Sequence, residues 1–391
     1  MKRVAVLGST GSIGVQTLEV IEGGGWGYYA PLLACGRNIG LLMEQIKRFR
    51  PEAVAVLRRE DAEAIRRERP DIDVYCGESG LLQAIEETEF DMAVNALVGI
   101  SGMAPTMKLI EKGGVRIALA NKETLVAGGR IVMSAAKEAG VSILPVDSEH
   151  SAVLQAFRGN EKNRIKRIIL TASGGPFRGY TRERLEGVSV KEALAHPNWA
   201  MGKKISVDSA TMMNKALEII EAKWLYSLAP QKIDVLVHPQ SIVHSMVEYD
   251  DGAMMAQLGT PDMRLPIAYA LTYPERHSSG ARRLSVKDLC RLDFEEPSAE
   301  ACRALNLAYA VLQEIADTSK DSPAIALNGA NEALVALFLE GRIRFVDIVD
   351  TLEKLIAIHE PARAMSIGDI LEIDAKARKD AERLAGIKTL L

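Results

Sequence analysis

The stretch Val4–Gly14 reads VAVLGSTGSIG and decides the fold of the first part of the chain. Its four apolar residues predict a buried strand, and the turn after them leads into a segment with helical periodicity. The glycines Gly8, Gly11 and Gly14 follow a GxxGxxG spacing, where GxGxxG is more familiar. Such a turn lets the backbone approach a pyrophosphate at a helix N-terminus, although a tight strand-to-helix turn also needs glycine. Its place on the first strand of a βαβ series favours a dinucleotide site.

The same sequence pattern continues through the first 146 residues, where short apolar or β-branched runs alternate with segments of helical periodicity. Strands that alternate with helices indicate βαβ units and a parallel sheet covered on both faces. About six strands in this order predict an α/β, doubly wound, Rossmann-like domain over residues 1–146. The predicted strands are Val4–Leu7, Tyr28–Ala34, Ala53–Leu57, Met92–Leu97, Arg116–Ala120 and Val141–Val146.

After these residues the pattern predicts a central α+β domain over residues 147–272. Ser209–Leu225 has the periodicity of one long helix. Asp251-Gly252 is a turn signal between two strand-like runs, so we expect a hairpin and an antiparallel sheet. The strand-like runs are Arg167–Thr171, Val235–Val237, Val243–Tyr249 and Ala253–Leu258.

The last third of the chain has two parts. Residues 273–298 are irregular and charged, which predicts a linker. Residues 299–391 have helical periodicity nearly throughout, which predicts a C-terminal helical bundle. The total length of 391 residues suits two or three domains.

The bulk composition indicates a globular protein in the cytoplasm. Hydrophobic residues make up 48% of the chain, and the net charge of −4 gives no reason to expect a nucleic-acid or membrane-surface partner. No apolar run approaches the ~20 residues of a membrane helix, and Met1-Lys2-Arg3 leads straight into a strand, which leaves no room for a targeting peptide. The four scattered cysteines form no CxxC pair and are typical of reduced thiols.

The end of the second predicted strand indicates which nicotinamide cofactor the domain prefers. NAD sites usually place an acidic residue there, which holds the ribose hydroxyls. Here the strand ends in Ala34-Cys35-Gly36-Arg37-Asn38, where that carboxylate is missing and Arg37 can pair with a 2′-phosphate. NADP is therefore favoured over NAD, against the alternative of a solvated surface arginine.

Asn121-Lys122-Glu123 directly follows the predicted strand Arg116–Ala120. Ligands of open α/β sheets bind outside the carboxyl ends of the strands, so the triplet can face the nicotinamide and the substrate. It equally fits a helix N-terminus with a favourably placed acid.

A group of acidic residues predicts a metal site. If the chain stays extended after the sixth strand, Asp147 and Glu149 point the same way, and two such charges favour a cation between them. Glu218 lies on the same side of the predicted long helix as Asn214 and Lys215 and offers a third carboxylate. Three oxygen ligands suit Mg²⁺ or Mn²⁺ better than zinc. The alternative is that Asp147 and Glu149 only cap a following helix.

Several side chains in the middle of the chain can bind an anion. Ser173 opens a glycine loop, Ser209 is expected to start the long helix, and Asn214 and Lys215 follow. Together they make a phosphate cradle, whereas taken singly Ser209 is an N-cap and Lys215 a solvated residue.

The loop His196–Gly202 contains Trp199. An indole on a mobile loop can cover a small substrate and exclude water, although Trp and Met more often pack in a core. His238 and His244 flank Pro239 in a strand-like region, and we interpret them as structural.

Eight strings of residues occur in an order that closely resembles the 1-deoxy-D-xylulose 5-phosphate reductoisomerase family. The resemblance spans nearly the whole chain and is weakest toward the C-terminus. The strings are Leu7–Gly14, Ala120–Glu123, Pro145–Ser151, Ala172–Phe177, His196–Gly202, Lys204–Lys215, His238–Ser245 and Pro261–Arg264. Ala216 is a departure, because the family usually has Gly after the lysine.

The resemblance implies a homodimer of V-shaped, three-domain subunits. It implies that the enzyme rearranges the skeleton of 1-deoxy-D-xylulose 5-phosphate, stepwise or concertedly. Reduction by NADPH then gives 2-C-methyl-D-erythritol 4-phosphate, an isoprenoid precursor of the non-mevalonate pathway.

The resemblance also implies the roles of individual residues. The implied ligands of Mg²⁺ or Mn²⁺ are Asp147, Glu149 and Glu218. The implied NADPH contacts are Thr10, Gly11, Ser12, Ile13, Gly36, Arg37, Asn38, Asn121, Glu123 and Gly202. The implied substrate contacts are Lys122, Ser148, Ser173, His196, Ser209, Asn214, Lys215 and Glu218. The implied catalytic residues are Lys122, Glu149, His196 and the flap residue Trp199, with either Lys122 or Glu149 in proton transfer.

Two other classes of protein compete with this interpretation. A semialdehyde or acyl-phosphate dehydrogenase needs a nucleophilic cysteine, and none of the four cysteines lies in a recognisable nucleophile setting near a histidine. A non-catalytic NADPH-binding regulator has no need of a carboxylate triad, so metal-independent behaviour would favour it.

Overall fold

The computed structural model describes residues 2–199 and 201–387, and contacts within it divide the chain into two compact units. The first unit comprises Met1–Thr124, Val132–Ser151 and Asp262–Arg282. The second comprises Leu125–Ile131, Ala152–Pro261 and Arg283–Leu391. Residues 388–391 of the predicted C-terminal helical domain lie outside the described part of the chain.

The first unit is built on a parallel sheet with the strand order β5-β4-β3-β1-β6-β7-β8, and β2 pairs with β1 beside this path. The chain fills one half of the sheet from β1 outward and then crosses to the other side for β6. The prediction of a doubly wound sheet is confirmed, and its switch point falls between β1 and β6. The strands are β1 Lys2–Leu7, β2 Tyr28–Tyr29, β3 Leu32–Cys35, β4 Ala53–Val56, β5 Asp73–Cys76, β6 Met92–Asn95, β7 Arg116–Leu119 and β8 Ile143–Pro145.

Two details of the predicted sheet were wrong. The run Tyr28–Ala34 is not one strand, because it is interrupted at Pro31, which has no N–H to donate to a ladder. The edge strand β5, Asp73–Cys76, was missed. It is short and only half-buried, so it lacks the continuous apolar run that marks its neighbours.

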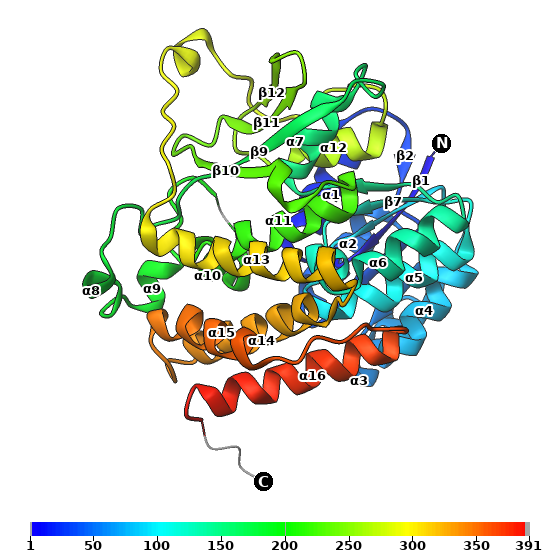
Figure 1. Cartoon of the computed structure of the whole chain (residues 1–391). Coiled ribbons are helices and arrows are strands. Elements are labelled where there is room, and N and C mark those ends of the chain that lie inside the picture. Colours follow the sequence, from blue (N-terminus) through cyan, green and yellow to red (C-terminus); the bar gives the residue numbers. More distant parts are fainter. Residues whose placement is uncertain (1, 200, 388–391) are drawn as a thin grey trace. The chain divides into compact units, whose positions relative to one another are not determined.

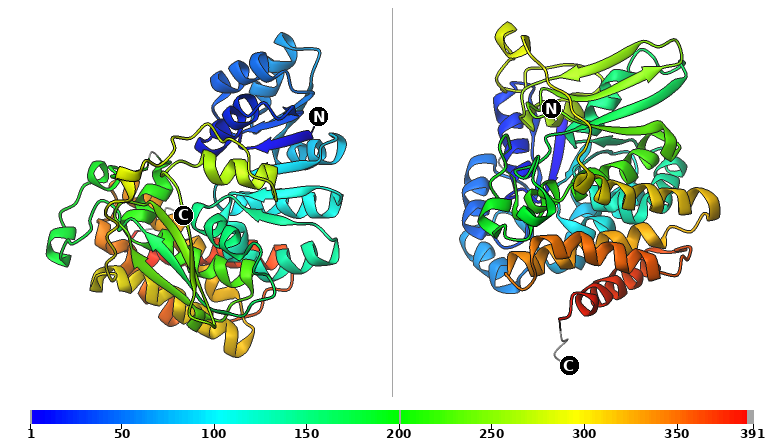
Figure 2. Two further views of the ribbon diagram at one scale, coloured as in Figure 1. Left: turned by 90° about the horizontal axis from the view of Figure 1, so that it is seen from above. Right: turned by 60° about the vertical axis from the view of Figure 1, so that its left-hand side comes forward.

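Helices cover this sheet, and apart from α12 they are coloured from blue through cyan to blue-green in Figures 1 and 2. After the second sheet the chain returns to the first unit as α12, which packs against α1, β7 and β8. The helices with residues in this unit are α1 Ser12–Gly23, α2 Ile39–Phe49, α3 Arg59–Glu68, α4 Gly77–Glu87, η1 Gly99–Gly102, α5 Met103–Lys112, α6 Lys122–Glu138, α7 Ser148–Phe157 and α12 Arg264–Thr272.

The second unit has a four-stranded sheet with the order β10-β9-β11-β12. The predicted hairpin is confirmed, since β11 and β12 are antiparallel and Gly252 turns between them with φ +84°. The predicted antiparallel sheet is in fact mixed, because β9 pairs with β11 in the antiparallel sense but with β10 in parallel. In the described residues, helices α8 to α11 and the 3₁₀ helix η2 separate these two strands, and such a long connection permits a parallel crossover. The strands are β9 Ile165–Ala172, β10 Ile233–Val237, β11 Val243–Tyr249 and β12 Met254–Leu258.

The helices of the second unit pack around one hydrophobic core that also includes the inner face of this sheet. The C-terminal helices, orange to red in Figure 2, lie beside one another, and α14 contacts both α15 and α16. The helices are α8 Arg182–Leu185, α9 Val190–Ala193, α10 Lys203–Ala210, α11 Met213–Tyr226, η2 Pro230–Lys232, η3 Val286–Leu289, α13 Ala299–Thr318, α14 Ser322–Leu339, α15 Phe345–Ile358 and α16 Ile367–Leu384.

Helix α14 is apolar on nearly every side. It is the one helix in the described part of the chain with the length and composition of a membrane span, and 78% of that window is buried inside the fold. Its neighbours α10, α11, α13, α15 and α16 account for this burial. The composition therefore fits a core helix of the bundle.

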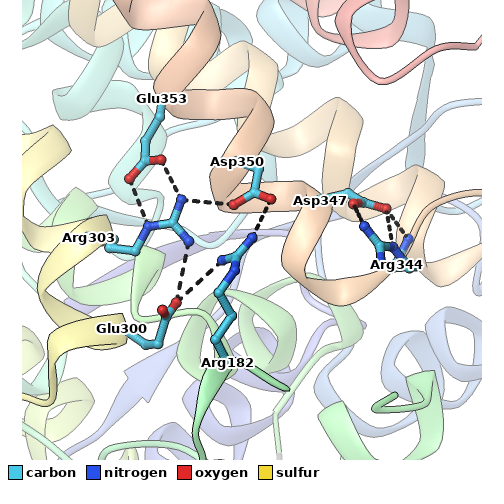
Figure 3. Close-up of polar contacts among 7 residues, drawn as sticks. All are labelled: Arg182, Glu300, Arg303, Arg344, Asp347, Asp350 and Glu353. Atoms are coloured by element: carbon cyan, nitrogen blue, oxygen red, sulfur yellow. Dashed lines mark hydrogen bonds and ion pairs between the residues drawn. The ribbon is translucent and has the colours of Figure 1, made fainter. Parts of the chain in front are cut away.

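Ion pairs tie the segment around α8 to the C-terminal helices (Figure 3). Arg182 Nη2 lies 2.6 Å from Asp350 Oδ2, and Arg303 Nη2 lies 2.8 Å from Asp350 Oδ1. Arg303 also pairs with Glu353 and Glu300. These side chains keep 22–38% of their surface exposed, so each single pair contributes little. Together they place α8 against α13 and α15.

Close packing of α14 on α16 leads to a stability prediction. A Cβ on Gly329 would lie 2.6 Å from Asp374 Oδ1 and 3.0 Å from Asp374 O, so Gly329→Ala should lower the free energy of unfolding by roughly 1–3 kcal/mol. Gly40 in α2 has nothing within 4 Å of its Cβ position, and Gly40→Ala should raise stability by about 0.5–1 kcal/mol. Thermal and urea unfolding measure both, and equal stability of the two variants would contradict this packing.

Candidate active site

The glycine turn between β1 and α1 lies at the switch point of the first sheet. Gly8 has φ +88°, and a Cβ there would lie 2.6 Å from Ala96 O. A Cβ on Gly14 would collide with Gly8 O, so backbone packing requires both glycines. Gly11 is the N-cap of α1, and no side chain caps the first turn, which leaves backbone N–H groups for an anion. The turn therefore fits both interpretations of the glycine pattern, a tight strand-to-helix turn and a loop that can approach a pyrophosphate.

Gln45 on α2 supports this turn and was missed by the sequence analysis. Its Oε1 accepts a hydrogen bond from Ser9 Oγ at 2.8 Å, and its Nε2 donates to Ser9 O at 2.8 Å. Both side chains are buried. A glutamine beside the buried Leu42 and Ile46 of α2 was the available signal, because a buried amide needs specific partners.

The predicted 2′-phosphate site follows β3. Gly36, Arg37 and Asn38 are all exposed, and Asn38 caps α2 by accepting a hydrogen bond from Leu41 N at 3.3 Å. Thr10 from the glycine turn reaches the same strand end, where its Oγ1 lies 3.2 Å from Cys35 Sγ. The exposed guanidinium of Arg37 is thus carried on a loop whose two ends are fixed.

Asn121 caps α6 and also shapes the loop after β6. Its Oδ1 accepts from Thr124 N at 3.1 Å, and its Nδ2 donates to Leu97 O and Gly99 O at 2.9 and 2.8 Å. Asn95, another residue missed from sequence, donates to Gly102 O at 2.9 Å. Two buried amides therefore fix the 96–102 loop at the carboxyl edge of the sheet.

Lys122 and Asp147 form an ion pair in the first unit. The Lys122 Nζ–Asp147 Oδ2 distance is 2.9 Å, and the side chains are only 7% and 12% exposed. Asp147 Oδ1 also accepts from Glu149 N at 3.2 Å, and Ser148 Oγ donates to Glu149. The expectation of an extended chain at Asp147-Ser148-Glu149 was wrong, because α7 begins at Ser148. The capping alternative describes the backbone correctly.

In the second unit, the predicted long helix Ser209–Leu225 is two helices. Met212 has φ +64° and separates α10 from α11, so Ser209 lies in the last turn of α10 and does not start a helix. Helix α11 begins at Met213 with Met212 at its N-cap position, and Thr211 Oγ1 accepts a hydrogen bond from Met213 N at 3.3 Å. A single non-glycine residue in the left-handed region leaves no trace in hydrophobic periodicity, which explains the error.

The loop after β9 packs directly against this junction. Gly175 has φ +64°, and a Cβ there would lie 2.8 Å from Ser209 O. Ser173 Oγ accepts from Gly175 N at 3.1 Å and lies 2.9 Å from His196 Nε2. Glycine at position 175 therefore allows the backbones that carry Ser173 and Ser209 to approach each other closely.

His196 organises the loop that carries Trp199. Its Nδ1 accepts hydrogen bonds from Asn198 N at 3.1 Å and Trp199 N at 3.0 Å. A neutral imidazole that accepts at Nδ1 carries its proton on Nε2, which then donates to Ser173 Oγ. Burial lowers the pKa of His196 to about 4, in agreement with this neutral form. The Ser173 hydroxyl accepts two hydrogen bonds, so its own proton can be donated to an anion.

The start of α11 holds a buried carboxylate. Asn214 Nδ2 and Lys215 Nζ both bind Glu218, and the side chains of Lys215 and Glu218 are 3% and 1% exposed. The predicted common face of these three residues is confirmed. Ala216, which stands where the resemblance leads one to expect glycine, is fully buried in the hydrophobic core.

The two histidines interpreted as structural are both buried. His238 Nδ1 lies 2.7 Å from Asp293 O, and its ring stacks on Phe294 at 4.6 Å. Burial lowers the pKa of His244 to about 4, and its ring lies 6.1 Å from that of Trp199.

One unit has the doubly wound parallel sheet that is common among dinucleotide-binding α/β oxidoreductases, and the other holds a Ser173–His196 hydrogen bond and a buried Lys215–Glu218 ion pair. Models of 1-deoxy-D-xylulose 5-phosphate reductoisomerase match residues 4–129, and models of its C-terminal domains match residues 143–226 and 258–380. The chain belongs to the 1-deoxy-D-xylulose 5-phosphate reductoisomerase family.

Individual relatives agree over the full length. The 1-deoxy-D-xylulose 5-phosphate reductoisomerase of Geobacter sp. (strain M21) is 49% identical over 99% of this chain and 100% of its own, and that of Shouchella clausii is 48% identical over 98% and 100%. The Zymomonas mobilis enzyme solved with NADPH is 38% identical, with a TM-score of 0.89 over 98% of this chain and 99% of its own. A reductoisomerase solved with NADPH, fosmidomycin and magnesium is 36% identical, with a TM-score of 0.90 over 99% and 98%.

The hydrogen bonds of His196 predict its protonation state in solution. At pH 6 we expect a neutral imidazole with its proton on Nε2 and a pKa of about 4. Because the unfolded chain takes up this proton near pH 6.5, the group's contribution to stability is complete above 6.5 and is lost as the pH falls toward 4. ¹⁵N NMR of labelled histidine measures this, with His196→Gln assigning the resonance, and an imidazolium at pH 6 would contradict the arrangement.

Proposed function

We propose that this chain rearranges and reduces 1-deoxy-D-xylulose 5-phosphate to 2-C-methyl-D-erythritol 4-phosphate with NADPH and a divalent metal. This is a step of isoprenoid precursor synthesis by the non-mevalonate pathway. The observation that carries the proposal is the 49% identity to a reductoisomerase over 99% of the chain.

The proposed NADPH contacts lie in the first unit, apart from Gly202. Two observations support them: the uncapped first turn of α1 offers N–H donors to a pyrophosphate, and Arg37 is exposed after β3, where a 2′-phosphate would bind. The proposed contacts are Thr10, Gly11, Ser12, Ile13, Gly36, Arg37, Asn38, Asn121, Glu123 and Gly202.

The proposed metal ligands are Asp147, Glu149 and Glu218, and the proposed ion is Mg²⁺ or Mn²⁺. Each offers a carboxylate oxygen, the donor type that these hard cations prefer. Asp147 and Glu149 are half-buried and Glu218 is buried, and carboxylates withdrawn from water in this way gain from a nearby cation. The donor set therefore fits the ion.

The proposed substrate contacts combine hydroxyl, amide, imidazole and ammonium groups. The geometry of Ser173 supports its role. Its Oγ accepts two hydrogen bonds, so its own hydroxyl proton is available to be donated to an anion. The backbone of Gly175 brings Ser209 close to the same loop. The proposed contacts are Lys122, Ser148, Ser173, His196, Ser209, Asn214, Lys215 and Glu218.

The chain's own residues bind, orient and shield the substrate. Hydrogen bonds to the phosphate, away from the reacting carbons, would fix the substrate's orientation. Trp199, on the loop that His196 holds, would exclude water from the reacting atoms. Either Lys122 or Glu149 would transfer a proton. Lys122 would do so through its Nζ, which lies beside Asp147, and Glu149 through its carboxylate, which lies beside Ser148. When bound, NADPH supplies hydride and the cation polarises a carbonyl as a Lewis acid.

We also propose a homodimer. Strand β12 is an edge of the second sheet, and its Met254, Met255 and Leu258 are 48%, 44% and 39% exposed. An exposed apolar edge strand is a ready template for pairing with a second copy. A cytoplasmic location is proposed from the cysteine usage alone.

The proposed domains are residues 1–146 for NADPH binding, 147–272 for catalysis and dimerisation, 273–298 as linker and 299–391 as a helical domain. One family model ends at residue 129 and the next begins at residue 143, close to the proposed boundary at 146. The contacts of the chain instead group Asp262–Arg282 with the first unit.

The metal assignment predicts the behaviour of Glu218→Gln. NADPH oxidation with 1-deoxy-D-xylulose 5-phosphate should require Mg²⁺ or Mn²⁺ and stop in EDTA. Glu218→Gln should lose activity by about a hundredfold or more, because a Lewis acid supplies several kcal/mol to such a reaction. The surface variant Asp234→Asn is the control, and NADPH binding, followed by fluorescence, should survive in both. Full turnover in EDTA would defeat the assignment.

The cofactor assignment predicts a change in nucleotide preference. Arg37→Gln should raise the KM for NADPH roughly 10–100-fold, the loss expected for a charge-assisted hydrogen bond of about 1.5–3 kcal/mol. The KM for NADH should change little, because NADH has no 2′-phosphate. Arg59→Gln is the matched control, since Arg59 is a highly exposed arginine after the next strand of the sheet. An equal effect of Arg37→Gln on both nucleotides would contradict the proposed contact.

A further inference from the structure

Asp208 is a buried carboxylate that immediately precedes Ser209, and its side chain is 1% exposed. Its Oδ2 lies 2.8 Å from Lys204 Nζ, one turn earlier in α10. Its Oδ1 accepts a hydrogen bond of 2.8 Å from Asn331 Nδ2, and Asn331 lies on α14 and is fully buried. A single carboxylate therefore joins α10 to the C-terminal helices.

A buried polar contact of this kind is not the packing of two helices with the lowest free energy. A buried charge costs free energy unless it is fully paired, and apolar residues of similar volume often give equal or greater stability. Apolar contacts, however, tolerate small sliding and rotation, whereas a hydrogen bond of 2.8 Å fixes both partners. The joint between Asp208 and Asn331 therefore sets the register of α10 on α14.

The register of α10 matters for the residues that follow it. Ser209 is the next residue, and the Ser173 loop packs on the Ser209 carbonyl through Gly175. Helix α11, which carries Asn214 and Lys215, begins after the left-handed turn at Met212. A rotation of α10 would displace these groups together.

We propose that Asn331 is a positioning residue that holds the phosphate-binding side chains in place through Asp208. The proposal rests on the assignment of Ser173, Ser209, Asn214 and Lys215 to the substrate phosphate. Asn331 acts only through the carboxylate, so its removal should weaken phosphate binding more than it affects the chemical step.

Asn328 provides a matched control on the same helix. It lies one turn before Asn331, is also fully buried, and donates from Nδ2 to Glu332 Oε1 at 3.0 Å. Glu332 belongs to α14 itself. Asn328→Leu therefore removes a buried amide of the same size but leaves the joint to α10 intact.

Asn331→Leu in the full-length enzyme should raise the KM for 1-deoxy-D-xylulose 5-phosphate about tenfold. The inhibition constant of inorganic phosphate, used as a competitive inhibitor, should rise by the same factor. The kcat should fall by a smaller factor, because the phosphate contacts also orient the substrate, and the KM for NADPH should stay within about twofold, because these contacts do not touch the nucleotide. Asn328→Leu should leave all four quantities within about twofold, even where its Tm falls as far as that of Asn331→Leu.

Ser209→Ala, measured alongside, separates the assignment of the phosphate contacts from the positioning role of Asn331. If Ser209→Ala leaves the inhibition constant of phosphate unchanged, the assignment of these residues to phosphate is wrong. If Ser209→Ala raises it but Asn331→Leu does not, or if Asn328→Leu has an equal effect, the positioning role of Asn331 is overturned. Should a leucine variant not fold, Asn331→Ala and Asn328→Ala serve in the same comparison with the same outcomes.

Discussion

Carboxylates withdrawn from water and held beside a lysine are the constraint on which both candidate regions depend. In the first unit Asp147 lies 2.9 Å from Lys122, and in the second Glu218, 1% exposed, binds Lys215. A charge in such surroundings is tolerated only when its partners are fixed, so the backbone around each pair must be rigid. The local structure of both regions follows from that requirement.

Rigid backbone at these positions comes from helix ends. Lys122 lies in the first turn of α6, which Asn121 caps, and Glu149 lies in the first turn of α7. Lys215 lies in the first turns of α11, after the left-handed turn at Met212. Short helix starts direct side chains to one point more firmly than a loop does, because each backbone torsion is already set by the helix.

The sequence was informative wherever a pattern has a fixed geometrical meaning. Alternating strands and helices predicted the doubly wound sheet, and the i, i+4 spacing of Asn214 and Glu218 predicted their common face. The helix start at Ser148 was available from sequence only as the capping alternative. The break at Met212 was not predictable in this way, because it depends on one residue's φ value, which tertiary packing selects against local preference.

The buried residues that hold the site's loops and helices in place are a second group whose partners the sequence could not predict. Gln45, Asn95 and Asn331 are buried amides in apolar surroundings, and each binds a backbone or side chain far away in the chain or in another element. The partner separations of Gln45 and Asn331 are 36 and 123 residues, so no local spacing connects these two residues to their partners. A buried amide inside an apolar helix or strand nevertheless indicates that a partner exists, because an unpaired one would cost about 1–3 kcal/mol. Such positions indicate where a buried hydrogen bond holds part of the site in place, and only the structure shows which group the amide binds.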